Sequence, residues 1–119
     1  MSGKTTHRSW LFRIQDMIDH IGEIQEYLQY DSIHSFQNEN YKQKAVERYF
    51  EIIGEAARYV PEDIREKYQS IEWNKIIGTR NKIAHDYLGV SSRLLWEIYE
   101  NKLEPLKQDL IKLLQEENQ

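Results

Sequence analysis

The stretch "RSWLFRIQDMIDHIGEIQEYLQY", residues 8–30, decides the fold class of this chain. Its apolar residues recur at alternating three- and four-residue steps, which is the repeat of an amphipathic helix with one buried face. The stripe consists of Leu11, Ile14, Ile18, Ile21 and Leu28, with Trp10, Met17 and Ile24 widening it and Gln25 as the one polar break. The pattern predicts a long helix over about residues 8 to 30.

The middle of the chain continues in the same manner. The polar stretch DSIHSFQNEN, residues 31–40, favours a loop or a frayed helix end, because Asn, Asp and Ser prefer turns. A second long helix with the same apolar stepping then extends to Val60. Pro61, followed by two acidic residues, suits the first position of a short helix that ends near Ser70.

Two further helices are predicted in the C-terminal half. A third long helix starts at about Glu72 and ends before Gly89, since glycine commonly follows a helix C-terminus. The last helix is capped by Ser91 or Ser92, and Pro105 should kink or divide it because proline cannot continue a helical ladder.

The composition agrees with a helical protein. The 119 residues include only five glycines, two prolines and three valines, whereas Leu, Ile, Glu, Lys and Gln are abundant. We therefore expect an all-α fold, an antiparallel four-helix bundle with a short extra helix. A single domain over residues 1–119 is expected, with loose ends at about 1–7 and 115–119.

Charge and residue usage exclude several classes of function. The chain has no cysteine, which excludes thiol chemistry and cysteine-ligated zinc, and its net charge of −4 argues against a broad basic surface for DNA or RNA. No segment approaches the roughly 18 apolar residues of a membrane span, so we expect a cytoplasmic protein without a membrane partner. No metal site and no cofactor are predicted.

The stretch "GTRNKIAHDYLGV", residues 78–90, concentrates the groups that could carry chemistry. It places Arg80, Asn81, Lys82, His85 and Tyr87 within eight residues. On an ideal helix Arg80 and His85 lie about 140° apart, so they cannot share one continuous face. Either the helix loosens before His85, or two copies of the chain combine their groups in a twofold dimer, which we favour.

The residue types suit metal-free RNA cleavage. His85 can exchange a proton near neutral pH, and Arg80 presents a planar fork that matches a phosphate. The ribose 2′-hydroxyl of RNA would be the nucleophile, so DNA should resist. Asn81 could orient His85 or bind phosphate, and Lys82 adds local positive charge. Tyr87 is a poor base at neutral pH, but its hydroxyl could hold a phosphate oxygen or accept a transferred group.

At these residues the chain resembles the HEPN superfamily, and specifically the HepT-like ribonuclease toxins. The family signature of Arg, four residues, His, one residue and Tyr is present as Arg80-NKIA-His85-Asp-Tyr87. The resemblance covers about residues 8 to 114 and includes "YFEIIGEAARYVPEDIREKY" and "LLWEIYENKLEPLKQDL". In many relatives proline directly follows leucine in the last block, whereas Glu104 intervenes here.

The resemblance implies a helical homodimer that cleaves RNA without metal and is inhibited by a cognate antitoxin. That antitoxin resembles a minimal nucleotidyltransferase, which transfers AMP from ATP to the motif tyrosine, here Tyr87. The added phosphate would satisfy Arg80 and repel the RNA backbone. Glu55, in the family-like "GEAA" segment, is either a partner that orients Arg80 or a group of the site itself.

Two other interpretations remain open. The chain could be a non-catalytic HEPN module that binds nucleotide or serves as the partner subunit of a nucleotidyltransferase. It could also be a helical assembly protein, in which Arg80 and His85 are only favourable cations at a helix C-terminus.

Overall fold

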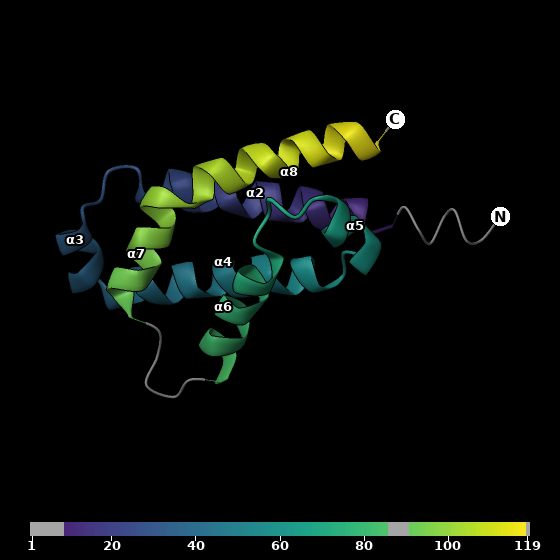
Figure 1. Ribbon diagram of the computed structural model, residues 1–119. Coiled ribbons are helices and arrows are strands. Elements are labelled where there is room, and N and C mark those ends of the chain that lie inside the picture. Colours follow the sequence, from purple (N-terminus) through teal and green to yellow (C-terminus); the bar gives the residue numbers. More distant parts are fainter. Residues whose placement is uncertain (1–8, 86–90, 119) are drawn as a thin grey trace.

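The fold consists of helices throughout the part of the chain that the computed structural model describes, residues 9–85 and 91–118 (Figure 1). The all-α fold class is therefore confirmed. The helices are α2 (Leu11–Leu28), α3 (Ile33–Asn38), α4 (Asn40–Arg58), α5 (Glu62–Lys67), α6 (Trp73–His85), α7 (Ser92–Asn101) and α8 (Leu103–Glu117). None of the helices so described is long and apolar enough to span a bilayer.

The long helices pack as a bundle around the central pair α2 and α4. Helices α2 and α4 lie side by side at the centre and run in opposite directions; α8 packs on α2 and α6 packs on α4 (Figure 1). The short helix α7 joins α8 at one end and contacts α3 and α4. As a result α6 is held chiefly by α4, and this arrangement determines where the candidate site lies.

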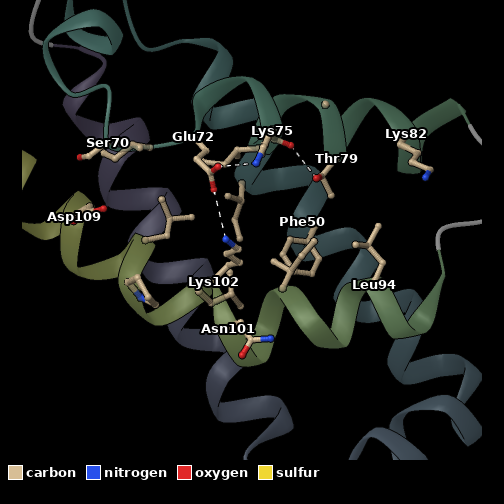
Figure 2. A pocket seen from close by; sticks show the side chains of 18 residues that line it. Phe50, Ser70, Glu72, Lys75, Thr79, Lys82, Leu94, Asn101, Lys102 and Asp109 are labelled. Atoms are coloured by element: carbon tan, nitrogen blue, oxygen red, sulfur yellow. Dashed lines mark hydrogen bonds and ion pairs between the residues drawn. The ribbon is translucent and has the colours of Figure 1, made fainter.

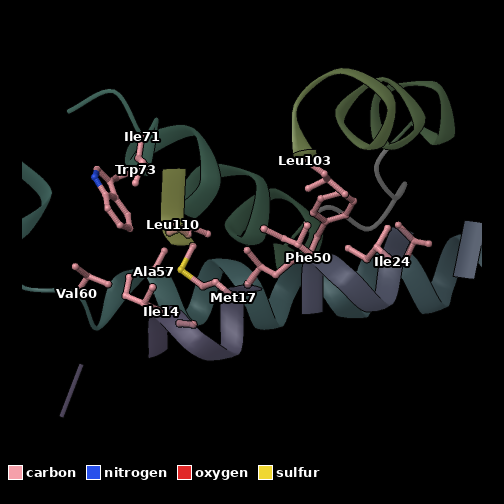
Figure 3. Close-up of a cluster of buried hydrophobic side chains, with 14 of the residues drawn as sticks. Ile14, Met17, Ile24, Phe50, Ala57, Val60, Ile71, Trp73, Leu103 and Leu110 are labelled. Carbon is pink, nitrogen blue, oxygen red and sulfur yellow. The ribbon is translucent and has the colours of Figure 1, made fainter. Parts of the chain in front are cut away.

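The core runs along α2, α4 and α8 (Figure 3). Buried residues of the other helices complete it, among them Phe36 of α3, Trp73 of α6 and Trp96 of α7. Each buried Ile, Leu or Met stabilises the fold by about 1.5–3 kcal/mol relative to an exposed one. The buried face of α2 is rotated slightly from the predicted one. Leu11 and Ile18, which were predicted to be part of it, are only partly buried, and Gln25 lies beside this face rather than within it. The fully buried residues of α2 are Ile14, Met17, Ile21, Ile24 and Leu28.

Gln25 instead belongs to a polar border between α2 and α8. Its side-chain amide donates to Glu104 at 2.8 Å and accepts from Lys107 at 2.9 Å. The three tryptophans, Trp10, Trp73 and Trp96, are buried as expected for core aromatics.

The prediction of a loop or a frayed helix end over residues 31–40 was wrong, since this segment contains the separate helix α3. The Ser32 side chain accepts from the backbone N–H of Ser35, and the Ser35 side chain accepts from that of Ser32, so both ends of a capping box are satisfied. Phe36 is completely buried, with its ring centroid 5.7 Å from that of Trp96. Capping and one buried aromatic therefore outweigh the turn preference of the segment.

The predicted division near Pro105 is confirmed. Helix α7 ends at Asn101 and α8 begins at Leu103, which makes Pro105 the third residue of α8. A proline in a first turn forfeits no hydrogen bond, but its ring would clash with the carbonyl of Asn101 in a continuous helix. The predicted cap at the start of α7 is also present, since Ser91 accepts from the backbone N–H of Leu94.

The C-terminal end differs from the expectation of a loose segment at 115–119. Helix α8 continues to Glu117, whose carboxylate accepts from the Tyr68 hydroxyl at 2.6 Å and from the Lys67 ammonium at 2.7 Å. Burial and the hydrogen bond to Glu117 raise the pKa of the Tyr68 hydroxyl above its ordinary value. The predicted loose N-terminus, residues 1–7, lies outside the described residues.

Candidate functional site

The site is built on α6, and Arg80 lies where that helix meets α4. Helix α6 continues from Trp73 to His85, so it does not loosen before His85, which was one of the two arrangements considered from the sequence. The stem of Arg80 lies directly over Gly54 of α4. About a quarter of the Arg80 side chain, 24%, remains exposed, which leaves its head accessible.

Two side chains hold the guanidinium of Arg80. Its Nε lies 3.2 Å from Oε2 of Glu55, and its Nη1 donates to Oδ1 of Asn81 at 3.1 Å. The same Glu55 oxygen also accepts from Nη1 of Arg58 at 3.4 Å. The structure thus brings Arg80, Glu55 and Asn81 together, although the contact between Asn81 and Arg80 was not foreseen.

A small cavity of about 170 Å³ opens beside Arg80, with room for several water molecules. Its charged groups come from three helices and comprise three arginines and three carboxylates. Arg13 is additionally held with its guanidinium carbon 4.1 Å from the centre of the Tyr59 ring, a cation–π contact. The charged residues of the wall are Arg13 and Asp16 of α2, Arg48, Glu51 and Glu55 of α4, and Arg80 of α6.

The sequence interpretation missed Arg13 and Arg48. They are 35 positions apart and 32 or more positions from Arg80, so only the crossing of α2, α4 and α6 brings the three guanidinium groups to one cavity. No local spacing rule predicts such a juxtaposition.

Lys82 lies on a different side of α6 from Arg80. It is on the rim of a groove of about 570 Å³ that separates α6 from α7 and α8 (Figure 2). The floor of this groove is apolar, with Phe50 and Ile53 of α4 facing Leu94 of α7. The structure therefore does not place Lys82 with Arg80 in one protomer.

At the polar end of the groove, the carboxylate of Glu72 lies between two lysines (Figure 2). It lies 2.8 Å from the ammonium of Lys75 and 4.0 Å from that of Lys102. The hydrogen bond from Lys75, together with its positive charge, keeps the pKa of the Glu72 carboxyl below its ordinary value. The groove rim is thus a mixture of lysines and carboxylates rather than a basic track.

The remaining predicted residues are placed less completely. His85 is the last residue of α6, and Tyr87 lies outside the described residues. In the described ranges no three His, Cys, Asp or Glu side chains are grouped in a way that could hold a metal ion. The predicted roles of His85 and Tyr87 therefore stay predictions.

Comparisons with known proteins match most of this chain, including the segment that carries Arg80. A family model described as Ribonuclease HepT-like matches residues 17–113. A protein of Thermococcus cleftensis with the name "Probable ribonuclease HepT" is 32% identical over 110 residues, which cover 92% of this chain and 97% of that protein. A protein of Methanocaldococcus jannaschii with the name "Putative RNase" is 32% identical over 97 residues, covering 82% and 89%.

The chain therefore belongs to the HepT-like ribonuclease family. A search of solved structures gave no match.

Proposed function

We propose that this chain is a metal-independent endoribonuclease whose transition state is stabilised by Arg80. The observation that carries the proposal is the arrangement of the guanidinium, which Glu55 and Asn81 hold in a fixed orientation at the edge of a cavity. A preorganised cation of this kind favours the extra negative charge of a pentacoordinate phosphorane. Membership of a ribonuclease family supports RNA as the substrate.

The chemistry needs only the groups of the motif and of the RNA. His85 takes the proton of the ribose 2′-hydroxyl, whose oxygen forms a bond to the adjacent phosphorus. The bond from phosphorus to the 5′-oxygen breaks, and a second histidine protonates this leaving oxygen. The products are a cyclic 2′,3′-phosphate and a 5′-hydroxyl, so the reaction consumes no water in this step.

A twofold dimer accounts for how Arg80 and His85 act together. Because α6 is continuous, the two residues are about 140° apart around the helix axis and cannot both face one phosphate from the same protomer. Two copies related by a twofold axis would bring the arginine of one protomer and the histidine of the other to a shared cleft.

Inhibition by a nucleotidyltransferase is part of the same proposal. Tyr87 follows His85 by two residues, so AMP attached to its hydroxyl would place a phosphate close to the reacting groups. The chain would then be the toxin of a toxin–antitoxin pair, with a minimal nucleotidyltransferase as the antitoxin. Incubation with such an enzyme and ATP should add the mass of AMP to the wild type and not to Tyr87→Phe.

The balanced charge of the cavity favours a second candidate function. Three carboxylates line the cavity together with three arginines, so it lacks the uncompensated positive charge that binding of a long polyanion such as RNA needs. The alternative is a non-catalytic nucleotide-binding module or partner subunit of a nucleotidyltransferase, which would show no RNA cleavage under any condition.

The deciding experiment is cleavage of RNA in EDTA by wild type, Arg80→Ala and His85→Ala, with the ends mapped. Cyclic 2′,3′-phosphate and 5′-hydroxyl ends from the wild type alone are expected. An RNA with a 2′-deoxy residue at the cleaved position is the matched substrate control and should resist. Cleavage that requires added divalent metal would contradict the proposed mechanism.

A further inference from the structure

Gly54 lies where α4 packs against α6, directly under the side chain of Arg80. It is buried in the middle of α4 and faces α6. A Cβ atom at this position would overlap Cβ of Arg80, and would lie 2.9 Å from Cγ of Arg80 and 3.1 Å from the carbonyl oxygen of Ile76. A methyl group therefore has no room between the two helices.

The crowding cannot be relieved by a rotamer change. The atoms that a methyl group would meet are the root of the Arg80 side chain and a backbone carbonyl, and both move only when α6 moves. In contrast, a Cβ at Gly22 in α2 or at Gly78 in α6 would meet nothing within 4 Å. Since glycine inside a helix is less favourable than alanine, Gly54 is the one of these three whose absent side chain has a packing reason.

Consecutive residues of α4 thus fix both ends of Arg80. Gly54 determines how closely Cβ and Cγ of Arg80 approach α4. The carboxylate of Glu55 lies 3.2 Å from Nε of the Arg80 guanidinium. If α6 were displaced from α4, the stem would rise while Glu55 stayed behind, so the guanidinium would lose its orientation toward the cavity.

We infer that Gly54 is a positioning residue for Arg80. Because Gly54 has no side chain, α6 packs close enough to α4 to hold the guanidinium where the reaction requires it. This inference rests on the proposed function, in which Arg80 contacts the scissile phosphate. Misplacement of a catalytic group by about 1 Å can cost about 100-fold in rate. Gly54 has no side chain that could bind RNA, so substrate affinity should change little.

The first test compares Gly54→Ala with the matched control Gly22→Ala in RNA cleavage. We expect Gly54→Ala to lower kcat by about 10- to 100-fold with KM within about threefold of wild type. Gly22→Ala, a change of the same size in open space, should keep wild-type kcat. Wild-type kcat in Gly54→Ala would overturn the inference, and so would an equal loss in the control.

The second test measures melting temperature and does not depend on activity. In Arg80→Gly the Cβ and Cγ atoms that crowd position 54 are gone, so adding Gly54→Ala to this background should lower the melting temperature much less than it does in the wild type. Additive losses in the double variant would refute the contact. If Gly54→Ala alone does not fold, recovery of a folded double variant supports the inference, whereas failure of both overturns it.

These two tests also separate this inference from the proposed function. If the wild type does not cleave RNA, the proposed function is refuted. If the melting temperatures are nevertheless coupled, Gly54 still determines the position of Arg80.

Discussion

Replacing Glu55 by glutamine removes the charge that holds Arg80 and leaves an oxygen that can still accept from Nε. Two unit charges 3.2 Å apart attract by about 1 kcal/mol in bulk water and by about 5 kcal/mol at the effective dielectric constant of a protein surface. Because 24% of Arg80 and 37% of Glu55 are exposed, water screens most of this attraction. Exposed pairs of this kind contribute about 0.2–1 kcal/mol to stability.

The expected effect of Glu55→Gln on stability is therefore small, with a melting temperature lowered by no more than about 4 °C. The effect on catalysis should be larger, because a neutral hydrogen bond replaces the charge-assisted one, and a weakening of about 1.4 kcal/mol lowers the population of the correctly held guanidinium by about tenfold. We expect kcat for RNA cleavage to fall about tenfold, while the shape of the pH profile stays that of the wild type.

The matched control is Glu47→Gln, which removes a carboxylate of the same helix that is paired with Lys44 at 3.9 Å. It should leave kcat within about twofold of wild type, since Glu47 does not line the cavity beside Arg80. Wild-type kcat in Glu55→Gln would show that Arg80 does not need this partner. A loss of about 1,000-fold, with one limb missing from the pH profile of the residual activity, would instead make Glu55 a proton-transfer group.

Three further predictions concern the motif and the scaffold. His85→Ala should lower kcat by about 1,000-fold with an unchanged helical circular dichroism spectrum, and a residual rate near wild type would exclude His85 as the base. Burial raises the pKa of Asp31, but hydrogen bonds from Lys42 and Ser35 and the charge of Lys42 outweigh it and keep this pKa below its ordinary value. Asp31→Asn should thus be less stable to urea at pH 7, with a difference that closes as pH falls through the depressed pKa; a difference that persisted below it would contradict the ion pair. Phe36→Ala should cost about 3–5 kcal/mol in urea unfolding, and a loss under 1 kcal/mol would mean that α3 is not part of the core.

The long helices could be predicted because their information is local. The apolar stripe of α2 and the proline in the first turn of α8 are visible within a few turns of sequence. Helix α3 could not be predicted in this way, since Phe36 is its only fully buried residue. A single apolar residue gives no repeating pattern from which a helix could be recognised. The end of α8 was also missed, because the partners of Glu117 are about 50 positions away.

The candidate site was predictable only along α6. Arg80 and Asn81 are neighbours in the sequence, and Glu55 was suggested by the family-like segment around it. The roles of Gly54, Arg13 and Arg48 depend on how α2, α4 and α6 cross, which the sequence does not state. Lys82, by contrast, follows Arg80 by two residues in α6, so the helical repeat of about 100° per residue already puts the two side chains on opposite sides.

Because α6 is supported chiefly by α4, we expect the fold to open first at this helix on heating. A helix that packs chiefly on one neighbour opens at a lower free energy than a helix enclosed on several sides, so we expect α6 to detach from α4 while α2, α4 and α8 remain assembled. Inactivation would then precede melting, and amide protons of α6 would exchange with solvent sooner than those of α2. Anything that filled the groove beside α6 would slow both processes together.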